Sequence, residues 1–414
     1  MDDFDIVAFR SLDKVQPAGN VRVPEEQKRN VHGFFIKYFL QGQNLEDHLK
    51  VQLSQNEWQN QSFHEKYRKY FALLLPFLFF HVCWWPLALK YDVLSLYYTR
   101  YELPVTMIFG SFLAGATSEG GGAVAFPVMT LLLKIAPKVA RDFSLMIQSC
   151  GMSACSFTIL YMKIKLEWHS IICCSFGAAV SVIFGLEYLD DIIDNQQKKM
   201  IFVSIWFAFA VSLFMLNLQK KRQTFDQIPN FTIYHAIVLV ITGMFGGLLS
   251  AWTGSGVDIC SFSILTLLFR VSEKVATPTS VVLMWLNTWV GFYWRYLMQG
   301  DISGMAWEYF SVTVPVAVTM APLGSLCASF LHRQVLAGFI YILETVALLG
   351  FLATRPCYVL VITGFGIICV SSIFFLVIIK IGKILCDKVE RGSASFEAPS
   401  SSGSTNFTVE KVVF

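Results

Sequence analysis

Long apolar stretches run through most of this chain and restrict its fold more than any other feature. A bilayer core is about 30 Å thick and takes roughly 20 apolar residues of helix, so each stretch is a candidate membrane span. Charged residues make up only 15% of the sequence, whereas a soluble domain carries about 25%. The candidate spans are residues 70–89, 104–133, 143–162, 169–187, 200–218, 233–269, 277–298, 305–330, 335–353 and 357–382. The sequence therefore predicts an all-α polytopic membrane protein.

The two ends of the chain are polar and fall outside the predicted spans. Residues 1–69 contain no short apolar run followed by a cleavage site, so we expect a soluble N-terminal segment instead of a signal peptide. The first transmembrane helix is expected at 70–89 and the last at 357–382. Residues 383–414 include a Ser- and Gly-rich stretch, which predicts a disordered cytosolic tail.

Charge and cysteine content argue against several classes of partner. The net charge of +3 is small and forms no basic stripe, so no nucleic-acid partner is expected. The ten cysteines lie mostly inside apolar runs, and none has the spacing of a metal site. We find no nucleophile elbow, zinc-protease motif or phosphate-binding loop. The sequence therefore implies no metal, no cofactor and no enzyme, and it leaves the oligomeric state open.

The distribution of basic residues predicts an orientation, because cytoplasmic loops carry an excess of Lys and Arg. If each long apolar stretch crosses once, four basic clusters share the cytoplasmic side, which gives ten spans with both termini inside. The clusters are Lys66, Arg68 and Lys69; Lys134, Lys138 and Arg141; Arg270 and Lys274; and Lys380, Lys383 and Lys388. In this arrangement Lys163, Lys165 and Lys220 to Arg222 lie outside, against the rule. Asn230 begins a glycosylation sequon, Asn230-Phe231-Thr232, which would also lie outside.

An internal repeat occurs at an offset of 136 residues, which aligns Gly110 with Gly246. The matches include Thr117 with Thr253, Gly120 with Gly256, Phe126 with Phe262, Thr130 to Leu132 with Thr266 to Leu268, Lys138 to Ala140 with Lys274 to Ala276, and Ser144 with Ser280. We therefore predict two homologous four-span helical repeats with Gly-rich broken helices, at 104–218 and 233–353, plus flanking spans. The halves are parallel if the Gly-rich segments cross the membrane, and inverted if these segments are re-entrant hairpins.

The Gly-rich segments fall at the same place in each repeat and indicate a binding site. Consecutive glycines break a helix, and broken backbone at membrane depth survives only when it is buried in protein or faces water. Free N–H groups at the start of the following helix attract anions. The predicted substrate-binding residues are Thr117, Ser118, Gly120, Gly121, Gly122, Thr253, Gly254, Ser255 and Gly256. The alternative interpretation is close helix packing through small residues.

Ionisable residues inside spans are costly and commonly mark a pathway. Glu119 and Asp258 lie within the Gly-rich segments, and we expect one of them to couple transport to protons. The alternative is a static pair with Lys or Arg. Glu344, in an apolar helix, either has a function or pairs with a neighbour, and Arg295 is expected to snorkel from a helix end. Weaker candidates for lining a pore, or for hydrogen bonds between helices, are Gln148, Asn287, Ser144 and Ser280.

At these residues the chain resembles the sulfite exporter TauE/SafE family, in which each of two homologous halves opens with a Gly-rich break. The first break resembles Gly115 to Gly122 followed by Phe126-Pro127, then a basic loop from Lys134 to Ala140 and a helix with Ser144. The segment from Gly246 to Ser280 resembles the second half of the family in the same way, and the resemblance covers residues 104–353. It implies transport of small sulfur-containing or organic anions, without a cofactor. The carboxyl groups of Glu119 and Asp258 depart from the family pattern and would repel sulfite when charged.

The repeat, the breaks and the resemblance together predict a secondary transporter for small anions, and they favour the plasma membrane over an internal one. An anion channel of the same duplicated architecture is the nearest alternative, because both need a polar path between two halves. A membrane receptor or scaffold is a weaker alternative, because neither function requires a binding site at the breaks.

Overall fold

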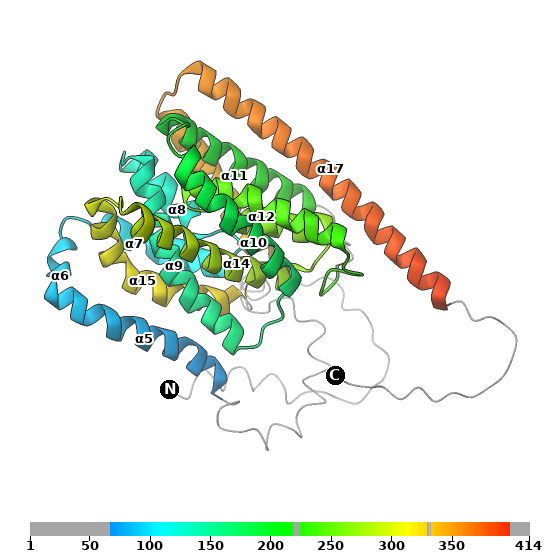
Figure 1. Ribbon diagram of the computed structural model, residues 1–414, viewed down its shortest axis with the longest axis horizontal. Coiled ribbons are helices and arrows are strands. Elements are labelled where there is room, and N and C mark those ends of the chain that lie inside the picture. Colours follow the sequence, from blue (N-terminus) through cyan, green and yellow to red (C-terminus); the bar gives the residue numbers. More distant parts are fainter. Residues whose placement is uncertain (1–66, 218–223, 329–330, 332, 398–414) are drawn as a thin grey trace, which may run out of the picture.

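The computed structural model describes residues 67–217, 224–328, 331 and 333–397, which form a bundle of helices (Figure 1). Residues 1–66, 218–223, 329–330, 332 and 398–414 lie outside the described residues. They include some of the basic residues named above, Lys66 and Lys220 to Arg222. The elements are α5 (Arg68–Lys90), α6 (Val93–Leu96), α7 (Glu102–Ala116), α8 (Gly121–Pro127), η3 (Val128–Leu132), α9 (Pro137–Tyr161), α10 (Trp168–Phe184), η4 (Gly185–Leu189), α11 (Asn195–Asn217), α12 (Ile233–Thr253), α13 (Val257–Ser263), η5 (Ile264–Leu268), α14 (Glu273–Tyr293), η6 (Trp294–Gln299), α15 (Gly304–Ala328), α16 (Arg333–Ala353) and α17 (Tyr358–Glu397).

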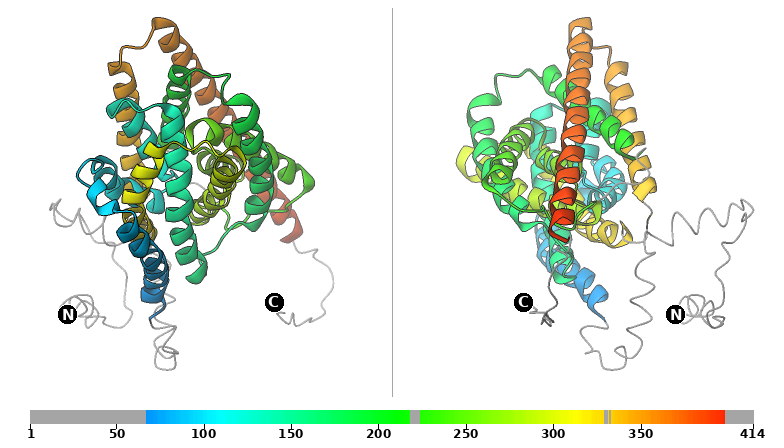
Figure 2. Two further views of the ribbon diagram at one scale, coloured as in Figure 1. Left: turned by 60° about the vertical axis from the view of Figure 1, so that its left-hand side comes forward. Right: turned by 90° about the vertical axis from the view of Figure 1, so that its right-hand side faces the viewer.

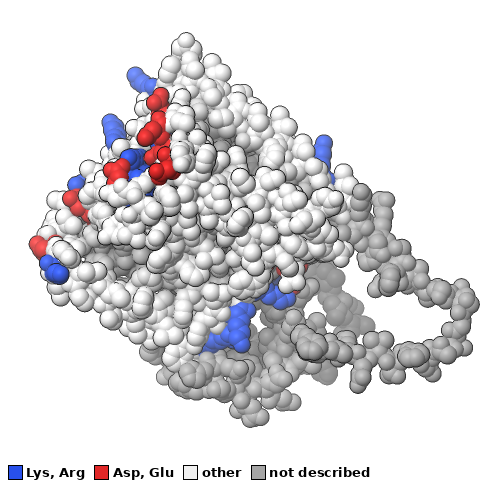
Figure 3. Space-filling view, viewed as in Figure 1, with Lys and Arg blue, Asp and Glu red and all other residues white. Residues whose placement is uncertain are grey.

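Eight helices within the described residues are long and apolar enough to cross a membrane. They are Arg68–Lys90, Pro137–Tyr161, Trp168–Leu189, Asn195–Asn217, Ile233–Thr253, Gly304–Ala328, Gln334–Ala353 and Tyr358–Cys386. Figure 3 shows Lys, Arg, Asp and Glu gathered mostly toward the margins of the viewed face, with a broad area between them that is almost free of charge. The prediction of an all-α, multi-pass integral membrane protein is confirmed.

The chain reverses its direction at each Gly-rich segment. In the first, a Cβ atom added to Gly110 of α7 would lie 3.1 Å from Val124 Cβ of α8, so α8 runs back along α7. In the second, a Cβ atom added to Gly246 of α12 would lie 2.7 Å from Val257 Cα at the start of α13. The segments 102–132 and 233–268 are therefore helical hairpins, here called the first and second hairpin.

Hydrogen bonds between helix ends define two faces of the bundle. On the first, which we call the N-terminal face, Arg68 donates to Tyr161 O at 2.7 Å, joining the start of α5 to the end of α9. Ile228 N donates to Glu167 Oε2 at 3.0 Å, and Phe225 N donates to Arg270 O at 2.9 Å. Both ends of the second hairpin and the start of α10 therefore lie on this face.

The opposite face, here called the distal face, collects the remaining helix ends. Arg100, just before α7, pairs with Glu308 near the start of α15 at 2.9 Å. Lys138 at the start of α9 pairs with Asp301 at 2.6 Å, immediately before α15. Because α7 and α9 both start here, the first hairpin begins and ends on the distal face.

These contacts correct the predicted count of ten spans. Eight segments have ends on opposite faces, namely α5, α9, α10 with η4, α11, α14 with η6, α15, α16 and α17. This set includes α14 with η6 in place of α12, which is long and apolar enough to cross but is an arm of the second hairpin. Each predicted four-span unit is thus a hairpin followed by three crossings. Sequence length could not distinguish a hairpin from a crossing, because the reversal depends on contacts such as the one between Gly246 and Val257.

The predicted sides of several basic residues change as a result. Lys134 and Lys138 follow the first hairpin on the distal face, whereas Lys163 and Lys165 lie on the N-terminal face with Arg270. Lys163 and Lys165, which opposed the positive-inside rule, therefore come to agree with it, whereas Lys134 and Lys138 now lie on the other face. We expect the N-terminal face in the cytoplasm. Asn230 lies on this face too, three residues before α12, instead of on the opposite side as its sequon suggested.

The last helix is longer than the sequence predicted. Figure 2 shows α17, in orange and red, as a long helix along one side of the bundle. It packs against α11 and η5, and a Cβ atom added to Gly382 would lie 2.2 Å from Leu267 O. Residues 383–397, predicted to belong to a disordered tail, continue this helix to Glu397, and Cys386 among them is buried beside the end of the second hairpin.

Close glycine contacts join the two hairpins to the crossing helices. A Cβ atom at Gly115 would lie 1.9 Å from Ala321 O, and one at Gly324 would lie 2.0 Å from Phe112 O, so α7 and α15 touch through their backbones. Gly243 meets Cys174 O in the same way at 2.1 Å, between α12 and α10. The small-residue packing weighed as an alternative is thus present along the hairpin arms.

Candidate functional site

The two chain breaks meet in the interior of the bundle. Residues 117–120 separate α7 from α8, and residues 254–256 separate α12 from α13. Gly120 N donates a hydrogen bond to Asp258 Oδ2 at 2.8 Å, across the boundary between the hairpins. A Cβ atom at Gly122 would lie 3.0 Å from Ser255 Cβ. Hairpins that enter from opposite faces thus place their broken backbone in direct contact.

The carboxylate of Asp258 binds the polar hydrogens of both breaks. Besides Gly120 N, it accepts hydrogen bonds from Gly256 N at 2.9 Å and from Ser255 Oγ at 3.0 Å. Asp258 is only 1% exposed. Backbone N–H groups stabilise a buried negative charge, which is what the sequence predicted for a substrate anion. In this conformation the protein's own carboxylate occupies that position, so Asp258 acts as a clamp between the hairpins.

Glycine is required where the breaks approach their neighbours most closely. A Cβ atom at Gly120 would lie 2.4 Å from Met284 Sδ and 2.5 Å from Gln148 Oε1. Gly254 has a positive φ of 82°, a conformation that L side chains rarely adopt, and packs against Arg141 O. These two positions therefore admit no side chain without movement of the site.

Substitutions at two neighbouring glycines test whether transport depends on the close contacts of Gly120 or only on having glycine in the break. We expect Gly120→Ala to reduce transport by about tenfold or more, because its methyl group would overlap three atoms that come from α9, α13 and α14. Gly121→Ala should be close to neutral, because its nearest contact is the flexible end of Met107 at 3.1 Å. The two variants are compared in the same flux assay at matched protein content. Equal activity of the two would show that the close contact at Gly120 does not matter.

Most of the predicted hydroxyl donors are engaged within the breaks. Thr117 Oγ1 donates to Leu113 O at 2.8 Å and accepts a hydrogen bond from Glu119 N. Thr253 Oγ1 lies 2.9 Å from Leu249 O and 2.8 Å from Ser255 O. Ser118 is buried in the first break. In this conformation the threonines stabilise the ends of α7 and α12 themselves.

The predicted pore-lining residues separate into two groups. Gln148 Nε2 donates to Gly254 O at 3.0 Å, and Ser144 Cβ contacts the same glycine, so both residues of α9 border the site. Their atoms Gln148 Oε1 and Ser144 Oγ are buried and have no partner among the described residues. On α14, Ser280 donates to Thr277 O and Asn287 donates to Leu283 O, within their own helix.

Two buried acidic side chains near the breaks lack partners. Glu119, in the first break, is 3% exposed, and its Oε1 atom has no hydrogen-bond partner in the described part of the chain. Glu344 of α16 is 1% exposed, and neither of its carboxyl oxygens has a partner within that part. Among the described residues, neither Glu119 nor Asp258 forms the static pair with Lys or Arg that the sequence left open, and Glu344 has no hydrogen-bonded neighbour.

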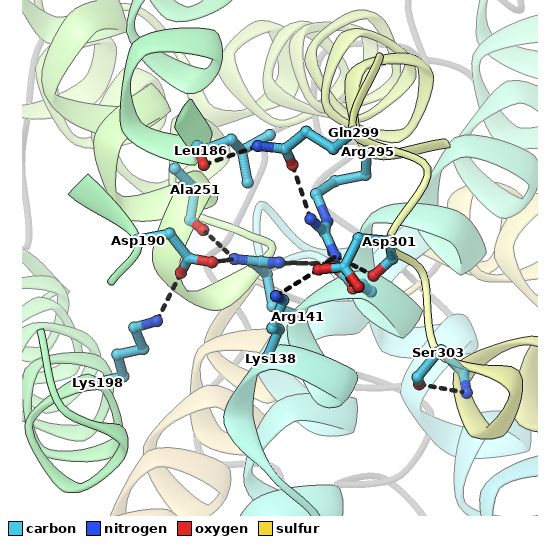
Figure 4. Close-up of polar contacts among 12 residues, drawn as sticks. Lys138, Arg141, Leu186, Asp190, Lys198, Ala251, Arg295, Gln299, Asp301 and Ser303 are labelled. Carbon is cyan, nitrogen blue, oxygen red and sulfur yellow. Dashed lines mark hydrogen bonds and ion pairs between the residues drawn. The ribbon is translucent and has the colours of Figure 1, made fainter. Parts of the chain in front are cut away.

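A buried ion network covers the distal side of the second break (Figure 4). Arg141 of α9 donates twice to Asp142 Oδ1, at 2.8 and 2.9 Å, and pairs with Asp190 Oδ2 at 2.5 Å. Lys198 of α11 also binds Asp190, at 2.5 Å. Arg295 of η6 donates to both carboxyl oxygens of Asp142, at 2.9 and 2.7 Å. The prediction that Arg295 snorkels is wrong, because these bonds hold its guanidinium in the interior.

The network joins elements from residues 104–218 and 233–353 and lies directly against the second hairpin. Arg141 Nη1 is 3.4 Å from Ala251 O, one helical turn before the break. Toward solvent the network ends in the exposed pair of Lys138 with Asp301, where the hydrogen bond from Lys138 lowers the pKa of the Asp301 carboxyl. The sequence analysis missed Asp142, Asp190 and Lys198. The sequence signal that could have indicated this network was Asp142, the acidic residue directly after Arg141.

The site is closed to both faces in this conformation. The four residues of the first break and Asp258 are all buried. A pocket of about 310 Å³ lies between α5 and α15, and another of about 260 Å³ lies beside α17 on the N-terminal face; neither is lined by a residue of the breaks. A solute therefore needs movement of a hairpin or a helix to reach the breaks.

Comparisons with known proteins identify one family. The family model described as "Sulfite exporter TauE/SafE" matches residues 103–352, which include both hairpins, the clamp and the ion network. No curated protein and no solved structure matches the chain in the corresponding searches. The matched region covers more than half of the 414 residues and nearly coincides with the range of the predicted resemblance. The chain belongs to the sulfite exporter TauE/SafE family of membrane transporters.

Proposed function

We propose that this protein is a secondary transporter that moves small sulfite-like, organosulfur or organic anions across the plasma membrane. The observation that carries the proposal is the contact between the two backbone breaks, whose N–H groups already hold one carboxylate, that of Asp258. A substrate anion of similar size and charge can use the same donors. Ser118, Ser144 and Gln148 border this position and complete the proposed binding site, together with Thr117, Gly120 to Gly122 and Thr253 to Gly256.

The repeat and the hairpins support transport by alternating access. We infer that the halves 104–218 and 233–353 are inverted, because the first hairpin starts from the distal face and the second from the N-terminal face. The first arm of each hairpin packs against a crossing helix of the other half, α7 on α15 and α12 on α10. Inverted halves around a fixed site allow one face to open while the other stays closed.

Proton coupling follows from the competition between Asp258 and a substrate anion for the same N–H groups. A proton on the Asp258 carboxyl removes its charge and weakens its hold on Gly120 N and Gly256 N, which frees these donors for the substrate. Loss of the proton restores the clamp and expels the anion. This sequence of events removes the repulsion expected between a carboxylate and sulfite at one site.

A flux assay in proteoliposomes tests the proposed function. The substrate panel contains sulfite, thiosulfate, sulfate and short organic acids, each measured with and without a pH gradient and against protein-free liposomes. We expect saturable flux of at least one sulfur-containing or organic anion and acceleration by the gradient. Flux that rises linearly with concentration would identify a channel, and binding without flux would favour a receptor.

A further inference from the structure

The side chain of Glu344 belongs to the face of α16 that points into the bundle. The buried residues of this helix are Ala337, Ile340, Glu344, Ala347 and Phe351, at alternating spacings of three and four, which define one helical face. The opposite face carries Ile342, Val346 and Leu349, all strongly exposed, as expected for contact with lipid. Glu344 is the one ionisable residue in the buried stripe, so a carboxyl group lies where α16 contacts the rest of the protein.

Contacts on either side of Glu344 place it against the first hairpin. Before it, Phe339 packs edge-on against Phe109 of α7, with ring centroids 5.8 Å apart. After it, Gly350 lies against Leu131 of η3, at 3.6 Å from an added Cβ atom. Glu344 lies between these contacts on the buried face of α16, a helix that packs against both α11 and the first hairpin, and its carboxyl group is close enough to that of Glu119 to interact with it electrostatically.

The charged groups around this pair are few and mostly engaged. At the distal end of α11, Lys198 binds Asp190 and Lys199 donates to Thr130 O at 3.0 Å. Glu102 is at the start of α7, and on α16 itself Tyr341 accepts a hydrogen bond from Asn217 Nδ2. At the breaks, Glu119 also interacts with Asp258. Among the described residues, no cation pairs with Glu119 or Glu344.

Asp258, Glu119 and Glu344 therefore differ in their hydrogen-bond partners. Asp258 accepts three hydrogen bonds from protein donors, which suit a carboxylate. Glu119 and Glu344 have unpartnered buried oxygens, and two unpaired negative charges in such a place are strongly disfavoured. A single proton distributed between two carboxyl groups lowers this cost while one negative charge remains for the clamp or a substrate to sense.

We propose that Glu344 is the proton-exchange partner of Glu119. The proton leaves the carboxylic acid of Glu119, whose O–H bond breaks, and forms an O–H bond on the carboxylate of Glu344, so the total charge of the pair is unchanged. Glu119 belongs to the first half and Glu344 to the second, so the transfer links protonation to the relative position of the halves. This inference rests on the proposed proton-coupled transport and adds to it a residue distant in sequence from both breaks.

The test compares Glu344→Gln with the unmodified full-length protein in proteoliposomes, using an anion that the flux assay identifies. Counterflow exchange without a pH gradient should stay within about twofold of the unmodified protein, because Gln preserves the shape of the side chain. Accumulation driven by a pH gradient should fall at least tenfold, and Glu344→Asp should restore part of it. Glu308→Gln, which removes the exposed partner of Arg100, is the matched control and should change neither rate.

The outcomes separate this inference from the proposed function. Gradient-driven accumulation that is unchanged in Glu344→Gln would overturn the role of Glu344 while leaving proton-coupled transport intact. Equal loss of counterflow and accumulation, without rescue by Asp, would also overturn it, because a purely structural role predicts that result. Absence of flux in the unmodified protein would overturn both proposals.

Discussion

Asp142→Ala is expected to destabilise the protein by about 3–5 kcal/mol, because it leaves two buried arginines without their shared carboxylate. Arg141 and Arg295 together direct four N–H groups at Asp142, and their side chains are 0% and 3% exposed. For a protein of this size the loss corresponds to a fall of roughly 3–6 °C in the apparent unfolding temperature. The measurement is thermal unfolding of the purified protein in detergent.

The matched control for this prediction is Asp301→Ala. Asp301 also pairs with a basic residue, Lys138, but its side chain is 63% exposed. An exposed pair contributes less than about 1 kcal/mol, so the unfolding temperature should change little. Equal shifts in the two variants would show that the network around Asp142 is not a buried, stabilising unit.

Asp258→Ala is expected to abolish transport, with flux below about 1% of the unmodified protein. The change removes the acceptor for Gly120 N, Gly256 N and Ser255 Oγ, and each unsatisfied buried donor costs about 1–3 kcal/mol. The two hairpins then lose the contact that closes the breaks against each other. Flux and monodispersity on size exclusion are measured together, so that loss of transport can be separated from loss of folding.

A control variant and a rescue experiment sharpen this prediction. Asp226→Ala removes an acidic residue that pairs with Lys165 on the surface, and it should transport normally. Addition of acetate to Asp258→Ala returns a carboxylate to the vacated position and should raise its unfolding temperature, whereas an equal concentration of chloride should raise it less. Wild-type flux in Asp258→Ala would contradict the role of Asp258 as the clamp.

The sequence predicted the secondary structure and the location of the breaks because both depend on local composition. Long apolar runs identify spans from their length, and the run from Glu119 to Gly122 cannot continue a helix such as α7 without cost. The family resemblance was equally local, because it depended on the Gly-rich segments and the basic loop after the first of them.

The direction of the chain at the breaks could not be predicted in this way. A stretch of 30 apolar residues fits a crossing with irregular backbone or a hairpin, and only contacts such as that of Gly110 with Val124 decide between them. The same limit applies to the ion network. Arg141 and Arg295 are 154 positions apart, and their shared acceptor, Asp142, becomes recognisable only when α9 and η6 are brought together.

The chemical roles of the acids also depended on the fold. The sequence grouped Glu119 with Asp258, because both lie in Gly-rich segments. The structure groups Glu119 with Glu344 instead, since these two have unpartnered oxygens among the described residues and Asp258 has three donors. Hydrogen-bond partners from a distant hairpin therefore distinguish Asp258, whose proposed protonation opens the clamp, from Glu119 and Glu344, the proposed proton-exchange pair.

The central claim is that solute crosses the membrane where the two hairpins meet. The most direct test is whether a water-soluble thiol reagent can reach a cysteine placed in the first break. Ser118→Cys is prepared in a variant that lacks the ten native cysteines and is reconstituted in sealed vesicles. A small anionic thiol reagent should modify the introduced thiol from either side of the membrane, and a saturating transported anion should slow the reaction. Sustained transport with no modification from either side would contradict the account, because solute would then cross without passing the breaks.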